Sequence, residues 1–224
     1  MEPYLAMLSK TPLFTSLSLD ELPHMLDCLN ARKRSYQAKE YILHEEDKVE
    51  EVGVILSGIV QVINEDALGN RSITVKLGPG ELFGEVIASS KTPVSPVSVM
   101  ADTDCEILQL RFGKIVTPCV RVCSFHTRVI ENMMNVLAQR NLFMNRKLSI
   151  LSQRSTRDKL LAYLAWQSQE RKTTEFDIPY NRDELADFLC VNRSALSREI
   201  SRMIDEELIS SERNHFVLYE GALL

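Results

Sequence analysis

The chain lacks several features that would assign it to a class of protein at once. It contains no run of about 18 or more apolar residues, so no membrane span is expected. Residues 1–10 combine neither a basic start nor a long apolar stretch, so we expect no signal peptide and a cytoplasmic location. Nucleophile–base sets, phosphate-binding glycine loops and paired catalytic carboxylates in a supporting context are also missing. The sequence therefore does not predict an enzyme.

Cysteine is scarce, and its number is odd. The five cysteines are Cys28, Cys105, Cys119, Cys123 and Cys190. Without a secretion signal, free and mostly buried thiols are expected rather than a disulfide scaffold.

Acidic side chains outnumber basic ones in the whole chain, but the basic ones are unevenly distributed. The net charge is −5, yet residues 116–160 carry 8 basic and 2 acidic side chains. The segments on either side are both acidic. Phosphate binding depends on local charge because counterions are released near the contact. The balance therefore leaves nucleic acid open as a partner without identifying it.

Glycine is confined to one region, where short β-prone runs alternate with turns. Seven of the eight glycines lie between Gly53 and Gly113. Strands are expected at 51–56, 59–63, 73–77 and 106–110. Short strands at such spacing favour a sandwich or barrel. Before them, residues 12–27 predict one or two short helices, with Ser18 as an N-cap and Glu21 three residues later.

A heptad pattern follows the β-rich region. Apolar or small residues recur at alternating steps of four and three, at positions 116, 120, 123, 127, 130, 134, 137, 141, 144, 148 and 151. Such a seam indicates a long helix pairing with a second helix in a two-chain coiled coil. Asn141 within it would fix register at a cost in stability. The alternative is a long helix that lies on its own domain.

The C-terminal segment has the pattern of a helix-turn-helix followed by a hairpin. Helix 156–169 and a short strand at 176–178 come first. Asn181 caps the next helix with Glu184 at its third position, and Asn192 caps a helix that runs to about Ile204. Ala186 is small enough for two helices to cross closely. A hairpin over 208–219, turning near Arg213-Asn214, completes the unit as a wing.

Polar side chains are left on the outer face of this unit. Arginine can donate two bonds to guanine, serine can contact bases or phosphates, and a helix N-terminus attracts phosphate. The predicted DNA-binding residues are Arg182, Asn192, Arg193, Ser194, Ser197, Arg198 and Arg202. The alternative is a packed helical hairpin with a solvated arginine face.

Three motifs in this order resemble the CRP/FNR superfamily of bacterial transcription regulators. They are LSGIVQV at 56–62, GPGELFGE at 78–85 and NRDELADFLCVNRSALSREISRMIDEELI at 181–209. The resemblance spans essentially the whole chain and implies an α+β fold with three parts. These are a jelly-roll-like β-roll sensor domain (1–115), a dimerisation helix (116–151) and a winged helix-turn-helix (152–224).

The resemblance also implies partners. It suggests a homodimer that binds a palindromic operator in double-stranded DNA, contacts RNA polymerase and responds to a small effector. Two positions depart from the family in the DNA-reading unit. Cys190 occupies a turn position where glycine is usual, and would carry strain at positive φ. Ser194 replaces a glutamate often found on the recognition helix, so a different target sequence is expected.

By this resemblance the effector pocket would include Gly84, Glu85, Ser95, Arg140 and Asn141. Members that bind cyclic AMP hold its phosphate with an arginine–serine pair, and Ser95-Pro96 stands there instead. No basic residue lies between 92 and 100, so cyclic AMP is not expected. The effector and any cofactor remain unknown at this point.

Two further interpretations stay open. Cys119, Cys123 and His126 share one helical face and could bind a metal or respond to oxidation, although Cys123 also fits the apolar seam. His24 or His44 could ligate haem in a haem-responsive regulator. A different class of function is a small-ligand-binding module whose DNA-binding unit is vestigial, which the acidic balance of 161–224 favours. No metal ligand is predicted.

Overall fold

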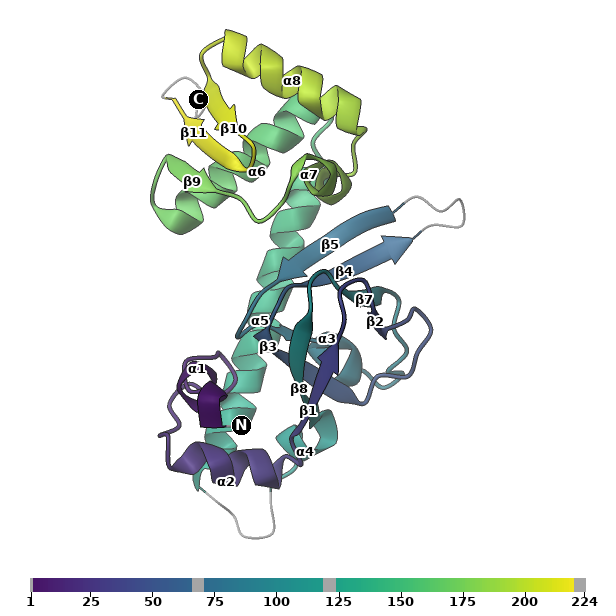
Figure 1. The fold of residues 1–224 in the computed structure, drawn as a ribbon, viewed down its shortest axis with the longest axis vertical. Coiled ribbons are helices and arrows are strands. Elements are labelled where there is room, and N and C mark those ends of the chain that lie inside the picture. Colours follow the sequence, from purple (N-terminus) through teal and green to yellow (C-terminus); the bar gives the residue numbers. More distant parts are fainter. Residues whose placement is uncertain (1, 66–70, 119–123, 220–224) are drawn as a thin grey trace. The chain divides into compact units, whose positions relative to one another are not determined.

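The computed structural model describes residues 2–65, 71–118 and 124–219 (Figure 1). The chain divides into two compact units, and each is described by itself. The first comprises Met1–Glu65 with Val75–Leu142, and the second comprises Asp66–Thr74 with Phe143–Leu224. Within the described ranges, no helix is both long and apolar enough to cross a membrane.

Two four-stranded sheets form the β-roll, with strand orders β1-β8-β3-β6 and β2-β7-β4-β5. The first sheet contains β1 (Arg32–Tyr36), β8 (Cys105–Arg111), β3 (Glu51–Ser57) and β6 (Leu82–Phe83). The second contains β2 (Tyr41–Leu43), β7 (Ser98–Ala101), β4 (Val60–Glu65) and β5 (Arg71–Leu77). The four strands expected from the sequence correspond to β3, β4, β5 and β8. The short or polar strands β1, β2, β6 and β7 were not anticipated.

Short helices accompany the roll. They are η1 (Glu2–Tyr4), α1 (Leu5–Leu8), α2 (Glu21–Cys28), α3 (Glu85–Ala88) and α4 (Phe112–Val116). The predicted pairing of Ser18 with Glu21 is present, because Ser18 N–H donates to Glu21 and Glu21 N–H donates to Ser18 Oγ at 3.2 Å. The N-cap of α2 itself is Asp20 and not Ser18, because the helix begins at Glu21. One face of β3 and β8 joins these helices and the first part of α5 (Ser124–Leu151) in a single apolar core.

Helix α5 has two distinct apolar faces. His126, Val129, Met133 and Val136 are buried against their own chain. The predicted heptad seam lies elsewhere on the helix and is largely uncovered, with Met134 64% and Leu148 67% exposed; Asn141 and Met144 are exposed as well. The described helix begins at Ser124, while seam position Val116 belongs to α4 and positions 120 and 123 lie outside the described residues.

The second unit contains a helical core and a three-stranded sheet, β10-β11-β9. Its elements are α6 (Thr156–Arg171), β9 (Glu175–Asp177), α7 (Arg182–Leu189), α8 (Arg193–Asp205), β10 (Ile209–Glu212) and β11 (His215–Leu218). The β10–β11 hairpin turns at Arg213-Asn214, as predicted. Tyr163 of α6 lies at the centre, with its ring 5.2 Å from that of Phe188 and 6.3 Å from that of Tyr180.

A lysine is buried in this unit. Lys147 of α5 is 8% exposed, and its ammonium donates to the carbonyl oxygens of Ile73 at 2.5 Å and Thr74 at 2.9 Å. The same nitrogen lies 4.2 Å from the ring centroid of Phe188. Loss of hydration lowers the pKa of Lys147 to about 8. Oxygen dipoles and an aromatic face therefore take the place of water around this charge.

Candidate nucleic-acid interface and sensor site

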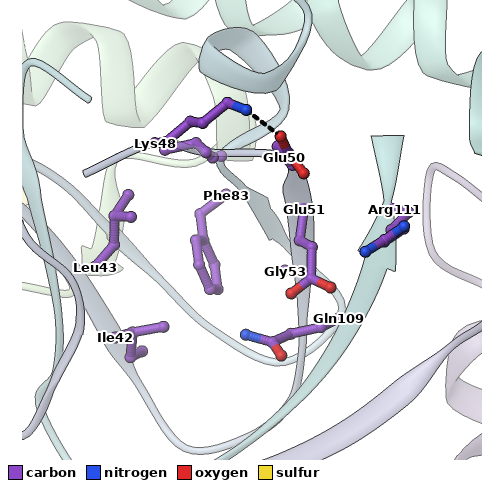
Figure 2. Close-up of a pocket in the computed structure, with 11 residues that line it drawn as sticks. Ile42, Leu43, Lys48, Glu50, Glu51, Gly53, Phe83, Gln109 and Arg111 are labelled. Atoms are coloured by element: carbon purple, nitrogen blue, oxygen red, sulfur yellow. Dashed lines mark ion pairs between the residues drawn. The ribbon is translucent and has the colours of Figure 1, made fainter. Parts of the chain in front are cut away.

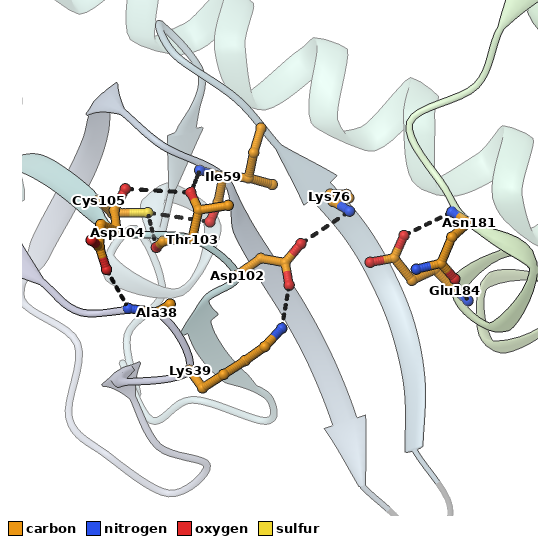
Figure 3. Close-up of polar contacts among 10 residues, drawn as sticks. All are labelled: Ala38, Lys39, Ile59, Lys76, Asp102, Thr103, Asp104, Cys105, Asn181 and Glu184. Carbon is orange, nitrogen blue, oxygen red and sulfur yellow. Dashed lines mark hydrogen bonds and ion pairs between the residues drawn. The ribbon is translucent and has the colours of Figure 1, made fainter.

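The two helices of the predicted helix-turn-helix begin at the expected caps. Asn181 Oδ1 accepts bonds from the N–H groups of Asp183 and Glu184, and Glu184 accepts one from Asn181 N–H at 2.8 Å (Figure 3). Asn192 accepts from Ser194 N–H at 2.9 Å. Cys190 ends α7 in the left-handed conformation, with φ of 51°. The positive φ suspected from the sequence is therefore present at a residue with a Cβ.

The packing of α8 against α7 determines which side chains face outward. Ala186 is almost completely buried, as is expected where two helices cross closely. Leu196, Ile200 and Met203 point into the core. Six exposed side chains that the sequence predicted to contact DNA form a set that we call the α8 face: Asn192, Arg193, Ser194, Ser197, Arg198 and Arg202.

Several residues of the α8 face are held by local bonds. Arg193 forms an ion pair of 2.8 Å with Asp183, and both side chains are about two-thirds exposed. Ser194 Oγ donates to Asn192 Oδ1 at 2.6 Å, and Arg198 Nε donates to the carbonyl of Ser194 at 3.2 Å. Such exposed contacts are worth little in water, so these side chains can exchange them for phosphate or base contacts at small cost.

Arg182 is placed differently from the other predicted DNA-binding residues. Its guanidinium lies 5.0 Å from the ring centroid of Phe216 and donates to Ser211 Oγ at 2.5 Å. Partial burial lowers the pKa of Arg182, although an arginine stays charged at neutral pH. This residue joins the start of α7 to the wing, which limits its freedom to reach DNA.

Two acidic side chains, Glu199 of α8 and Glu206 at its C-cap, form ion pairs within the second unit. Arg157 of α6 pairs with Glu199 at 3.5 Å and also with Glu206. Arg202 reaches Glu199 at 3.6 Å. The negative net charge of the C-terminal segment is thus partly paired within the fold.

In the β-roll, Glu85 and Arg140, which the resemblance placed in one effector pocket, lie within hydrogen-bond distance of each other. Arg140 Nε donates to Glu85 Oε1 at 2.8 Å, and its Nη2 donates to the carbonyl of Leu82 at 2.8 Å. Glu85 is 2% exposed, and its second carboxylate oxygen has no hydrogen-bond partner among the described residues. Gly84 precedes it with φ of 81°. An ion pair therefore already joins α3 to α5.

Ser95 is not joined to this pair. It is 1% exposed, and its hydroxyl donates to the carbonyl of Val97 at 2.6 Å. No hydrogen bond links it to Glu85 or Arg140 in the part of the chain that the structure describes.

Elsewhere in the roll, Asp102 accepts from Lys39 at 2.5 Å and pairs with Lys76 at 3.0 Å (Figure 3). Burial opposes ionisation of Asp102, but these two lysines together lower its pKa.

A pocket of about 390 Å³ is lined by Gly84, which the resemblance placed in the effector pocket, and by residues that were not predicted to bind an effector (Figure 2). These include Phe83, Glu51, Gln109 and Arg111, while Lys48 and Glu50, which also line it, form an ion pair of 2.5 Å. Neither Glu85 nor Arg140 lines it. The sequence signal for this pocket was the GPGELFGE motif, which contains Phe83 and Gly84.

His126 is tied to its own chain. It is 2% exposed, with Nε2 3.1 Å from the carbonyl oxygen of Ile115 and Nδ1 3.9 Å from Cys28 Sγ. Cys119 and Cys123 lie outside the described residues, so their relation to His126 stays a prediction. His44 stacks on Tyr41, with ring centroids 4.6 Å apart. His24 is exposed on α2.

Two protein-family models match the two ends of the chain. A cyclic nucleotide-binding domain covers residues 33–117, and a Crp-like helix-turn-helix domain covers residues 158–223. The chain belongs to the CRP/FNR superfamily. FnrL of Cereibacter sphaeroides, a transcriptional activator protein, is 26% identical over 212 residues, covering 85% of this chain and 78% of FnrL.

Other CRP/FNR proteins extend the comparison. The cAMP-activated global transcriptional regulator CRP of Pasteurella multocida is 22% identical over 188 residues, covering 82% of this chain and 88% of CRP. The structure of CLP, a c-di-GMP-responsive global regulator of Xanthomonas campestris, gives a TM-score of 0.69 at 19% identity, covering 88% of this chain and 99% of CLP. That likeness concerns the fold. As a CRP/FNR protein, the chain is a DNA-binding transcription regulator and not an enzyme.

Proposed function

We propose that this regulator acts in the cytoplasm as a homodimer, with each α8 in the major groove of one half-site of a palindromic operator. The observation that carries the proposal is the uncovered seam on α5. Met134 and Leu148 are about two-thirds exposed, although an adjacent face of the same helix is buried. Large apolar side chains exposed at heptad spacing indicate a missing partner helix, and a second copy supplies a matching one.

The dimer is tested by sedimentation equilibrium of the full chain. We expect Met134→Glu with Leu148→Glu to weaken self-association by at least about tenfold, because charges would be buried at the seam. The melting temperature at low protein concentration should stay close to that of the wild type, because both positions are exposed in the single chain. Leu19→Glu is the matched control, since Leu19 is 53% exposed and lies outside α5. An unchanged self-association constant in the double variant would refute the proposal that the seam forms the dimer interface.

DNA reading is assigned to the α8 face, with Arg193, Ser197 and Arg198 as the main base and phosphate contacts. Arg198→Ala should weaken binding to the selected operator by about 1–3 kcal/mol and relax base choice at one position. Fluorescence anisotropy at fixed salt, after selection of the operator from random DNA, measures both effects. Arg34→Ala is the control, because Arg34 is exposed on β1 of the sensor domain. Binding that shows no preference among sequences would instead favour a ligand-binding module with a vestigial DNA-binding unit.

The effector of this regulator is proposed to be a small molecule other than cyclic AMP. Glu85 is already paired with Arg140, and the Ser95 hydroxyl is already bonded to Val97. A cyclic phosphate would therefore lack the charged partner that such a group needs in a buried site. The chain resembles both the cAMP-activated regulator CRP and the c-di-GMP-responsive regulator CLP, so these similarities do not identify the effector. Contact with RNA polymerase is part of the proposal as a property expected of this type of regulator.

A further inference from the structure

Strands β3 and β8 carry two opposite charges that remain apart. Glu51 and Arg111 are direct cross-strand neighbours, so their side chains project from the same face of the sheet. Among the described residues, neither side chain takes part in a hydrogen bond or an ion pair. By contrast, Glu50 is satisfied by Lys48 at 2.5 Å (Figure 2). The hydrogen bond from Lys48 lowers the pKa of Glu50, and Arg111 is near enough to help lower it, but Arg111 forms no ion pair with Glu50 among the described residues. The pocket therefore offers one carboxylate and one guanidinium that are not bonded to protein groups, with no net charge between them.

An unsatisfied acceptor lies next to these charges. Gln109 is two residues from Arg111 on β8 and faces Gly53, which is two residues from Glu51 on β3. All four positions therefore share one face of the sheet. Gln109 Nε2 donates to Tyr36 at 3.2 Å, but Oε1 is buried without a partner among the described residues. Figure 2 shows the Gln109 amide close to the Glu51 carboxylate. Two acceptors at one end of the pocket suit a ligand with several N–H donors.

The rest of the pocket is apolar. The Phe83 ring lies directly over Gly53, where a Cβ would come within 2.2 Å of ring atoms. Ile42, Leu43 and Val49 complete this side. Binding sites for small molecules span about 300–1,000 Å³ and combine apolar walls with a few converging polar groups. At about 390 Å³, this pocket is at the small end of that range.

We propose that this pocket binds a small zwitterion of the α-amino-acid type with an apolar side chain. The ammonium group donates to Glu51 and to Gln109 Oε1, the carboxylate accepts from Arg111, and the side chain packs on Phe83. An anion alone would meet the unpaired Glu51 carboxylate, and a cation alone would leave Arg111 without a partner. The site is separate from the Glu85–Arg140 pair. That its ligand acts as the effector rests on the proposed function.

Isothermal titration calorimetry of the full chain without DNA tests the site, using L-valine, L-leucine, L-isoleucine, L-methionine and L-phenylalanine as probes. At least one should bind saturably below about 10 mM. The matched analogues L-leucinamide, which keeps only the positive charge, and N-acetyl-L-leucine, which keeps only the negative charge, should each bind at least about tenfold more weakly than L-leucine, because each loses a charge-assisted contact. Equal binding of leucine and either analogue would overturn the zwitterion assignment.

Variants distinguish this pocket from any other binding site. Glu51→Gln and Arg111→Gln should each weaken binding of the best probe by at least about tenfold, whereas Glu45→Gln, at an exposed position that does not line the pocket, should change it by less than about twofold. These positions are all partly or fully exposed, so the variants should fold normally. No saturable binding by any of the five amino acids, or equal effects of the Glu45 and Glu51 variants, would refute the site. A dimer that binds its operator but no amino acid would leave the proposed function intact and remove only this inference.

Discussion

The buried Lys147 ammonium makes the stability of the second unit depend on pH in a direction opposite to that of a paired lysine. The perturbation is Lys147→Met, which keeps a side chain of similar length against Phe188 and removes the charge. The folded-state pKa of about 8 lies below the ordinary value of 10.5 that applies to the unfolded chain. Between these two values the unfolded state binds more protons, so the free energy of unfolding increases as the pH rises.

The size of the effect follows from the two pKa values. A shift of 2.5 units corresponds to about 3 kcal/mol over the complete titration, because one unit is worth about 1.4 kcal/mol. From about pH 7.5 to pH 9.5 the wild type should gain about 2 kcal/mol relative to Lys147→Met. Below this window the buried ammonium opposes folding. The free energy of unfolding of Lys147→Met, relative to that of the wild type, should therefore be highest at the lower pH.

Urea unfolding at the two pH values, followed by fluorescence, measures this difference. The single tryptophan, Trp166, lies on α6 with its ring 6.1 Å from that of Tyr163, so it reports on the second unit. Titration of ¹³Cε-labelled lysine by NMR gives the pKa of Lys147 directly, with the variant assigning the resonance. Equal pH dependence in the two proteins, or a lysine pKa above about 10, would contradict the burial of this charge.

Three further outcomes are expected. Cys190→Gly should raise the free energy of unfolding by about 1 kcal/mol, since glycine tolerates the positive φ; a loss in urea unfolding would show that no strain is present there. Gly53→Ala should displace the Phe83 ring and weaken binding of the best amino-acid probe by at least about tenfold in calorimetry, with an unchanged affinity counting against the ring as a wall. The double variant Ser95→Arg with Pro96→Ser should gain measurable binding of cyclic AMP in calorimetry, and the wild type should show none in the same titration. Equal heats of binding from both proteins would refute the claim that the wild type lacks a charged partner for the cyclic phosphate.

Local chemistry explains why the helix starts were predictable. Asn181 and Asn192 cap helices, and Ser18 bonds Glu21, through contacts that reach only two or three residues along the chain. The positive φ at Cys190 was suspected from the resemblance, because the family usually has glycine at this turn position. Patterns whose physical cause is contained in a few consecutive residues are visible in a sequence, and the DNA-reading unit is built largely from such patterns.

Features that depend on distant segments were not visible in this way. Strand β1 has the sequence RKRSY, whose polar side chains conceal a strand that is held by pairing with β8, more than 60 residues later. Arg182 has the position of a DNA contact, but Phe216 and Ser211 of the wing hold it. Lysine is usually solvated, and the burial of Lys147 depends on the carbonyls of Ile73 and Thr74 and on the Phe188 ring. The pocket at Glu51 and Arg111 likewise depends on cross-strand register.

The two faces of α5 have a practical consequence for redesign. Met134 and Leu148 are separate from the positions that pack on the chain's own core, such as Val129 and Met133. In the proposed dimer, the exposed seam positions can therefore be recoded with complementary charges while the core of the β-roll stays unchanged. Two such chains would form an obligate heterodimer, and each could carry a different recognition helix. If the proposed homodimer holds, such a pair would recognise an asymmetric operator in place of a palindromic one.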